Sequence, residues 1–232
     1  MKVAIMQPYF LPYIGYFQLI AAVDQFIVYD NIKYTKKGWI NRNRILRKGK
    51  DVVFSLPLKA ASDYLHVCQR ELAADFNRIK LLNQFRDAYR SAPYFSKVFP
   101  LIEQIVQYEN TNLFHFLHYS IVQICAHLGI TTAIEISSAL AIDHSLKGED
   151  KVLALCGAVG GSVYVNAIGG TELYSKNAFA EKNIDLKFIR SKIFEYPQFD
   201  NVFVPWLSII DVLMFNRIDD VRACTSKNYE LI

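Results

Sequence analysis

The sequence contains no apolar run close to the ~18–20 residues that a membrane-spanning helix needs, so we expect no insertion into a membrane. The first residues pass directly into an apolar strand pattern, without the charged leader, apolar core and small-residue cleavage site of a signal peptide. The cysteines are scattered over positions 68, 125, 156 and 224, and no CxxC spacing occurs. We therefore expect reduced core thiols and a cytoplasmic location.

Acidic residues are absent from positions 31–50, which carry eight basic residues. The formal net charge of the whole chain is only +4, so the positive charge is concentrated in this segment. This distribution indicates an anionic ligand near residues 31–50 rather than a uniformly cationic protein. The chain has 232 residues, 52% of them hydrophobic and 21% charged, and these values predict one globular domain over residues 1–232.

The first thirty residues predict a β-loop-α-β unit. An apolar run at residues 3–6 is typical of a buried parallel strand, an apolar segment with helical spacing covers residues 17–23, and residues 25–29 form a second strand pattern. This unit predicts an α/β fold with a doubly wound, mostly parallel sheet. Ligands of such sheets bind outside the carboxyl ends of the strands, so the loop Gln7–Tyr16 is the first candidate site.

The spacing within this loop resembles a nucleotide-binding signature. Residues 12–16 fall where nucleotidylyltransferases and their adenylate-forming relatives carry His-x-Gly-His, which makes a nucleotidylyltransferase-like Rossmann variant our expected fold. Gly15 would let a nucleotide approach the helix start, with Gln7 and Pro8 beside it. Tyr13 and Tyr16 occupy the histidine positions, and tyrosine donates a hydrogen bond but is not cationic near pH 7. The alternative is a plain strand-turn-helix with aromatic packing.

Residues 31–58 predict a basic β-hairpin, because side chains alternate on either side of the turn at residues 47–50. Alternation places Asn41 and Asn43 on one face and Arg42 and Arg44 on the other. One row could hydrogen-bond a ligand while the other, with Lys37 nearby, meets its phosphates. Trp39 adds a stacking surface. The alternative is a solvated cationic hairpin.

The next segment, residues 61–129, predicts a helical insertion or lid on the α/β core, with helical patterns from Ala61 to Tyr108 and from Leu113 to Leu128. His115 and His118 share one helical face. Acidic or thiol ligands at matching spacing are missing, so we assign these histidines to packing or surface roles and predict no metal site.

A second glycine-bearing turn follows the strand pattern at residues 162–166. Asn166 ends the strand, Gly169 and Gly170 allow close approach of the backbone to a ligand, and Tyr174 is expected one turn into a new helix. The alternative is a tight turn without a ligand.

The remaining patterns predict a last strand at residues 186–189 and an aromatic loop at residues 194–200. A helix is expected at residues 204–215, with Pro205 in its first turn. Asp211 lies inside that apolar helix and needs a partner, for which an arginine or helix amides would serve.

Four long motifs, MQPYFLPYIGYFQLI, YTKKGWINRNRI, YVNAIGGTELY and YPQFDNVFVPWLSIIDVLMFN, occur in this order over nearly the whole chain. Together they resemble the WbqC-like protein family of bacterial surface-polysaccharide gene clusters. The resemblance implies a cytoplasmic role in building O-antigen or related sugars, and a member has been proposed to be a glycine transferase.

Our leading hypothesis is an enzyme that transfers an acyl or aminoacyl group, such as glycyl, to a nucleotide-linked amino sugar. Such a transfer needs an activated carboxylate, which relatives such as pantothenate synthetase form as an acyl-adenylate. ATP or a nucleotide-activated donor is therefore the expected cofactor. The loop Gln7–Tyr16 would hold the phosphates, and Lys37, Arg42 and Arg44 would neutralise their charge.

Three alternatives remain open. One is a nucleotidyltransferase-like enzyme that handles nucleotide sugars, because the signature histidines needed for adenylation are absent. Another is a non-enzymatic nucleic-acid binder, which the modest total charge and the single basic segment disfavour. The third is an assembly protein whose aromatic loop is a contact surface. The sequence leaves the oligomeric state open.

Overall fold

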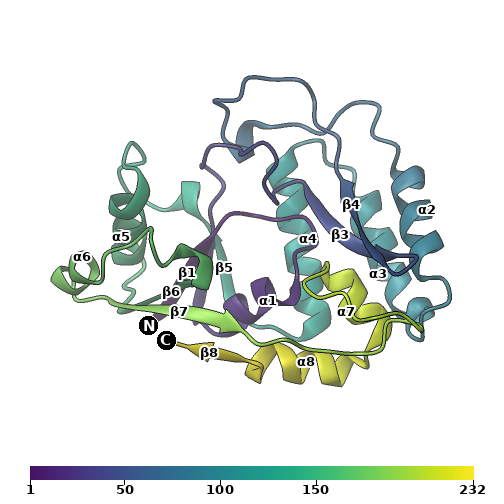
Figure 1. The fold of residues 1–232 in the computed structure, drawn as a ribbon. Coiled ribbons are helices and arrows are strands. Elements are labelled where there is room, and N and C mark those ends of the chain that lie inside the picture. Colours follow the sequence, from purple (N-terminus) through teal and green to yellow (C-terminus); the bar gives the residue numbers. More distant parts are fainter.

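The computed structural model describes residues 1–232 and shows an α/β fold with a mostly parallel six-stranded sheet (Figure 1). Its spatial order is β5-β2-β1-β6-β7-β8, and every neighbouring pair is parallel except β7 and β8. The predicted doubly wound, mostly parallel sheet is confirmed. The strands are β1 (Lys2–Met6), β2 (Gln25–Val28), β5 (Ala133–Ile136), β6 (Val163–Ala167), β7 (Asp185–Ser191) and β8 (Tyr229–Leu231).

Eight α-helices and a separate hairpin complete the fold. The hairpin consists of β3 (Arg42–Arg47) and β4 (Lys50–Ser55), and three short 3-10 helices are η1 (Val67–Gln69), η2 (Ser137–Ala139) and η3 (Ile168–Gly170). The α-helices are α1 (Ile14–Ala21), α2 (Arg78–Tyr89), α3 (Phe95–Gln107), α4 (Leu113–Leu128), α5 (Gly148–Ala158), α6 (Lys176–Glu181), α7 (Ile209–Phe215) and α8 (Ile218–Lys227). None of them has the length and apolar character needed to cross a membrane.

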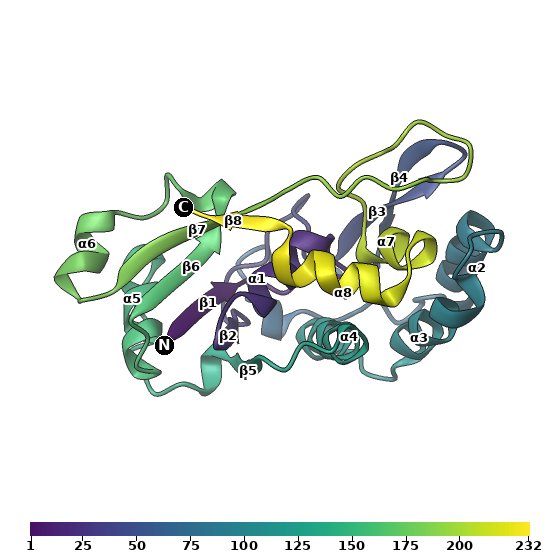
Figure 2. The same ribbon diagram turned by 90° about the horizontal axis from the view of Figure 1, so that it is seen from below.

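Helices cover both faces of the main sheet. Figures 1 and 2 show α5 and α6 on one face and α1 and α8 on the other. All four residues of β2 are buried, as expected for a strand enclosed on both sides. Val3 and Ile5 pack with α5 and α6 in one apolar cluster, whereas Ala4 and Phe26 belong to a larger cluster with α1 and α4.

The predicted hairpin is confirmed, and it lies outside the main sheet. The ring of Phe54 packs edge-on against Phe10 (5.8 Å) and Phe85 (4.9 Å), which joins the hairpin to the loop after β1 and to α2. The backbone N–H of Leu46 donates to the Tyr89 hydroxyl (3.0 Å). The hairpin is therefore held by its own apolar face rather than by strand pairing with the sheet.

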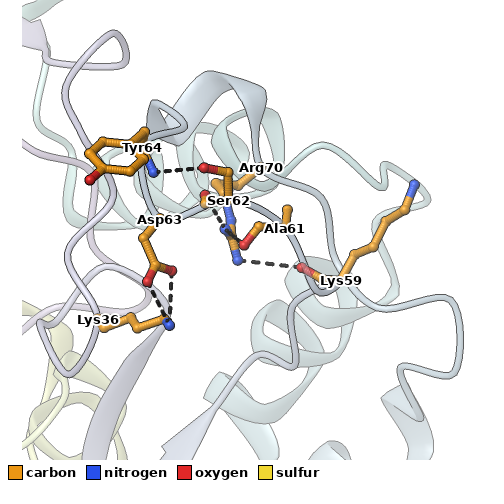
Figure 3. A network of polar contacts seen from close by, with 7 residues as sticks. All are labelled: Lys36, Lys59, Ala61, Ser62, Asp63, Tyr64 and Arg70. Carbon is orange, nitrogen blue, oxygen red and sulfur yellow. Dashed lines mark hydrogen bonds and ion pairs between the residues drawn. The ribbon is translucent and has the colours of Figure 1, made fainter.

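The predicted helix from Ala61 is wrong over residues 61–77, where the chain is irregular apart from η1. The buried guanidinium of Arg70 donates to the carbonyl oxygens of Lys59, Ala61 and Ser62 (Figure 3). It also lies over the Tyr34 ring. Figure 3 also shows the ion pair of Lys36 with Asp63. These long-range contacts hold residues 59–62 in an irregular path. The interpretation of residues 61–129 as an insertion stays a prediction.

Two other helix predictions need correction. Residues 204–208 are not helical, because Trp206 has a left-handed backbone (φ 59°) and Ser208 caps α7 through its hydroxyl. Tyr174 precedes α6 rather than lying inside it, since Ser175 is the residue that caps that helix. The helix α8 and the strand β8 were not predicted at all.

The buried groups largely follow the expectations from sequence. All four cysteines are free, three of them buried and Cys68 partly exposed. Asp211 does have partners, but the predicted arginine or helix amides are wrong. Its carboxylate instead accepts hydrogen bonds from the hydroxyls of Tyr89 and Tyr196 (both 2.9 Å) and from Nε2 of Gln198 (2.7 Å).

Candidate functional site

The strands β1 and β6 form the topological switch point of the sheet. From β1 the chain proceeds outward through β2 to β5, and it then returns to the other side of β1 with β6 and β7. Pairing between β1 and β6 is limited to Lys2 with Val163 and Val3 with Tyr164, so their carboxyl halves are not paired. Ligands of open α/β sheets bind where the connections that leave two neighbouring strands lead to opposite sides of the sheet. Both glycine-bearing loops leave the sheet at this place.

Tyr16 belongs to the core beneath the first loop. It is buried, its ring packs against Tyr9 and Phe26, and its hydroxyl donates to the carbonyl oxygen of Gln7 (3.0 Å). Burial raises the pKa of Tyr16 well above its usual value. The hydroxyl therefore stays protonated and fixes the path of the loop at Gln7, which is followed by the buried Pro8.

Tyr13 and Gly15 lie where α1 begins, beside the end of β7. A Cβ atom at Gly15 would overlap the Tyr13 ring and the Ser191 hydroxyl, so this packing by itself requires glycine. The Tyr13 ring meets Trp206 edge-on at 6.0 Å, and burial raises the pKa of Tyr13. Both residues help to line an apolar pocket of about 20 Å³, which is room for about one water molecule.

The second loop is organised around Asn166. This side chain is buried, its Oδ1 accepts from the N–H of Ala167 (2.9 Å), and its Nδ2 has no hydrogen-bond partner. A Cβ at Gly170 would overlap that Nδ2, and it would contact the ring of Tyr174 at 3.7 Å. A Cβ at Gly169, in contrast, would meet nothing within 4 Å. The backbone at Gly169 is thus the open part of this loop.

The two hairpin asparagines bind protein groups. Asn43 is buried, and its Nδ2 donates to the carbonyl oxygens of Leu11 (2.9 Å) and Phe10 (3.3 Å). Asn41 donates to the carbonyl oxygen of Leu56 (2.7 Å) and accepts from the Tyr34 hydroxyl (2.8 Å). Asn43 therefore joins the hairpin to the first loop, and Asn41 braces the start of the hairpin.

The hairpin arginines do not use all of their N–H donors in hydrogen bonds within the protein. Arg42 donates to the carbonyl oxygens of Lys37 and Gly38, and Arg44 pairs with Asp51 (3.0 Å) and donates to the carbonyl oxygen of Trp206 (3.3 Å). A guanidinium has five N–H donors, so each arginine has donors left for an anion. Lys37 is exposed and has a left-handed backbone (φ 63°).

Ser208 connects the hairpin with the first loop from the far end of the chain. Its N–H donates to the carbonyl oxygen of Arg44 (2.9 Å), and its hydroxyl donates to that of Leu11 (2.7 Å). The N–H of Ile209 donates to the carbonyl oxygen of Pro12 (2.9 Å). Three distant segments thus meet at one point.

The predicted residues form two groups. The hairpin residues lie with the first loop and with residues 196–208, whereas Asn166, Gly169, Gly170 and Tyr174 lie together at the end of β6. No hydrogen bond or ion pair joins the hairpin to the second loop. The sheet connects the groups, because β1 and β6 are neighbours.

Two buried charges that the sequence did not bring together are Asp30, after β2, and Lys151, in the first turn of α5. The carboxylate of Asp30 accepts from both hydroxyls of Ser137 and Ser138 (2.7 Å each) and from the N–H of Ser138 (2.9 Å). Lys151 is as buried as Asp30, at 3% exposure, and its Nζ lies 5.3 Å from the centre of the Tyr29 ring. In the sequence, the signal available for this pair was one charged residue directly after a strand and another in the first turn of a helix.

The side chain of Lys151 makes fewer hydrogen bonds than that of Asp30. Its only hydrogen bond is a 3.3 Å contact to the carbonyl oxygen of His144, although an ammonium group carries three donors. Burial lowers the pKa of Lys151, and the nearby carboxylate of Asp30 opposes this shift. An amine held in this way suits contact with an anionic ligand group.

The chain contains no group of three or more histidine, cysteine, aspartate or glutamate side chains that could hold a metal ion. His115 and His118 instead flank the ring of Phe114, at centroid distances of 5.6 and 5.7 Å. Burial lowers the pKa of His118.

These features define a class of α/β protein with an open, doubly wound sheet and a candidate ligand site at its switch point. The chain belongs to the WbqC-like protein family, whose model matches residues 7–223. It is also similar to "Uncharacterized protein Rv1507c" of Mycobacterium tuberculosis (strain ATCC 25618 / H37Rv). The two are 30% identical over 220 residues, which are 93% of each chain. No solved structure matches.

Proposed function

We propose that this protein is a cytoplasmic enzyme of bacterial surface-polysaccharide biosynthesis. It transfers an acyl or aminoacyl group, such as glycyl, to the amine of a nucleotide-linked amino sugar. The observation that carries the proposal is the switch point, where β1 and β6 are unpaired over their carboxyl halves and each continues into a glycine-bearing loop. Membership of the WbqC-like family supports the polysaccharide context.

In this proposal the two groups of residues contact different parts of the ligands. The first loop, with Gln7, Pro8 and Gly15, follows the phosphates, while Lys37, Arg42 and Arg44 balance their charge. Asn41 and Asn43 hold the hairpin in place.

The second group of residues contacts the reacting end of the ligands. Asn166 offers a free amide N–H, and the open backbone at Gly169 permits close approach. Gly170, with the Tyr174 ring beside it, leaves the space that the Asn166 amide occupies. Lys151 of α5 lies beside Tyr29, at the carboxyl end of β2, and contacts a carboxylate or phosphate oxygen of the donor.

The chemistry requires an activated carbonyl carbon. The sugar amine attacks that carbon, the bond to the leaving group breaks, and the nitrogen loses one proton. An adenylate made from ATP and a ready-made acyl or aminoacyl donor both meet this requirement. Donors that bind the departing oxygen stabilise the charge that develops on it. We assign this contact to the hydroxyl of Tyr13, at the start of α1, because the hydroxyl of Tyr16 is already bound to Gln7.

The test is a ligand screen followed by product analysis. Thermal unfolding is measured with nucleotides and with nucleotide-linked amino sugars, because a ligand that binds the folded state raises the melting temperature. The protein is then incubated with an amino sugar nucleotide, glycine and ATP, or with a preformed aminoacyl donor. A mass gain of one acyl group on the sugar is expected. The proposal fails if no sugar nucleotide binds and no acylated sugar forms.

A further inference from the structure

Both tryptophans of the chain lie half-exposed beside the same arginine. Trp39 is 43% exposed and Trp206 is 42% exposed, although tryptophan is usually among the most buried side chains. The guanidinium carbon of Arg44 lies 5.5 Å from the centre of the Trp39 ring, and Nη2 of Arg44 donates to the Trp206 carbonyl oxygen at 3.3 Å. One guanidinium group therefore contacts both the ring of Trp39 and the backbone of Trp206.

The backbone holds Trp206 in an unusual conformation. Its φ of 59° is in the left-handed region that residues other than glycine rarely adopt, and such strain persists only where neighbouring contacts impose it. Arg44 contacts this segment twice, through the bond to the Trp206 carbonyl and through its own carbonyl, which accepts from the N–H of Ser208. Lys37, close to Trp39, is also left-handed. Strained segments thus present both indoles at the surface.

The charge at this surface is positive and incompletely paired. Arg42 also lies over the Trp39 ring, at 5.4 Å, and it binds only backbone carbonyls. Arg44 binds Asp51, but its Nε is buried without a hydrogen-bond partner. A ligand that combines a flat ring with negative charge complements these groups.

We infer that Trp39 and Trp206 form an aromatic clamp for the base of a nucleotide, whose phosphates lie against Arg42 and Arg44. This inference rests on the proposed function and deepens it, because it assigns the nucleotide part of the sugar nucleotide to the hairpin. The sugar then extends from the phosphates along Tyr13 toward the switch point. Trp206 becomes a binding residue that the sequence motifs did not single out.

The two indoles also provide the test, because no other tryptophan contributes to the fluorescence of the protein. Uridine diphosphate and ATP are titrated against the wild type and against the single variants Trp39→Phe and Trp206→Phe. We expect each nucleotide to quench the remaining tryptophan in both variants. Pyrophosphate, which has charge but no ring, and N-acetylglucosamine, which has no base, are the matched ligand controls and should leave the emission unchanged.

Alanine variants measure the contribution of each ring. Trp39→Ala and Trp206→Ala should raise the Kd for nucleotide roughly 5- to 100-fold, the range for loss of base stacking, while the phenylalanine variants should recover most of the affinity. Unfolding curves of all four variants confirm that each protein is folded. The ratio of variant to wild-type Kd should be smaller for pyrophosphate than for nucleotides.

Several results would overturn the clamp. If nucleotides raise the melting temperature but neither indole changes its emission, the clamp is wrong and the proposed function stands. If no nucleotide binds by either method, both are wrong. Tighter binding of a single-stranded oligonucleotide than of mononucleotides would make this surface a nucleic-acid site. Emission that depends on protein concentration, with a dimer in sedimentation, would make it a self-association surface.

Discussion

The side-chain amide of Asn43 donates a 2.9 Å hydrogen bond to the carbonyl oxygen of Leu11, a fully buried residue with a left-handed backbone (φ 45°). This bond fixes the first loop to the hairpin. We expect Asn43→Ala to lower the free energy of unfolding by about 1–3 kcal/mol, because it leaves buried carbonyl groups unpaired. Urea denaturation measures this loss. Asn177→Ala, at an exposed position of α6, is the control and should stay within about 0.5 kcal/mol of the wild type.

Loss of either hairpin arginine should weaken ligand binding. We expect Arg42→Ala and Arg44→Ala each to reduce the binding free energy for a nucleotide or nucleotide-linked sugar by about 1–3 kcal/mol, the range for hydrogen bonds to charged groups. Calorimetry measures the affinity. Arg47→Ala removes the same charge from the exposed end of β3 and should bind normally. Equal affinity of all the variants and the wild type, with the fold intact, would contradict the assigned role.

The two adjacent glycines should respond differently to alanine. Gly169→Ala is expected to leave the free energy of unfolding within about 0.5 kcal/mol of the wild type, because its Cβ meets no atom, and yet to weaken ligand binding. Gly170→Ala should displace the Asn166 side chain and affect both properties. Unfolding curves and calorimetry on the two variants separate these effects. Normal binding by Gly169→Ala would show that no ligand approaches this backbone.

Asp211 should make stability depend on pH. Burial raises its pKa from 3.8 to about 6 in the folded protein, while hydrogen bonds from Tyr89, Gln198 and Tyr196 act in the opposite direction. Between about pH 4 and pH 6 the folded state therefore binds more protons than the unfolded state, so stability falls as pH rises. A shift of about two units corresponds to about 3 kcal/mol.

The variant Asp211→Asn removes this titration. Denaturation at several pH values should show that, between about pH 4 and pH 7, the wild type loses about 3 kcal/mol relative to the variant. Parallel stability profiles for the two proteins would be incompatible with a raised pKa at Asp211.

Lys151 should be dispensable for folding. Lys151→Met removes a buried ammonium and keeps most of the side-chain volume, so the free energy of unfolding at neutral pH should be unchanged or higher. Because burial lowers the pKa of Lys151, its contribution to wild-type stability rises with pH, and the variant should lack this rise. Ligand binding should weaken, whereas the exposed Lys147→Met serves as the control. A loss above about 2 kcal/mol would instead indicate a structural role for the bond to His144.

Much of this fold could be predicted from local patterns. The buried runs of β1, β2 and β6 are recognisable because strands covered on both faces are largely apolar. The helix α4 has both an asparagine cap at its start and a glycine in the left-handed conformation at its end. The segment at residues 61–77 was mistaken for a helix, because Arg70 organises it through carbonyl contacts that leave no periodic signal.

The candidate site was harder to predict. The asparagines of the hairpin are visible in sequence, but only the structure shows that Asn43 binds the backbone of the first loop. Trp206 lies far from Trp39 in sequence, and Arg44 brings them together. Lys151 resembles an ordinary lysine of a first helical turn until its burial is known. Contacts between residues far apart in the sequence determine where each of these side chains lies.

The bonds made by Ser208 have a consequence for the order of folding. A growing chain leaves the ribosome with its N-terminus first, so the loop after β1 and the hairpin exist long before residue 208 is made. Until then, the carbonyl group of Arg44 lacks its partner, that of Leu11 has only the Asn43 amide, and the segment carrying Trp206 has no anchor. The contacts that join the loop after β1, the hairpin and the Trp206 segment are therefore completed only near the end of synthesis.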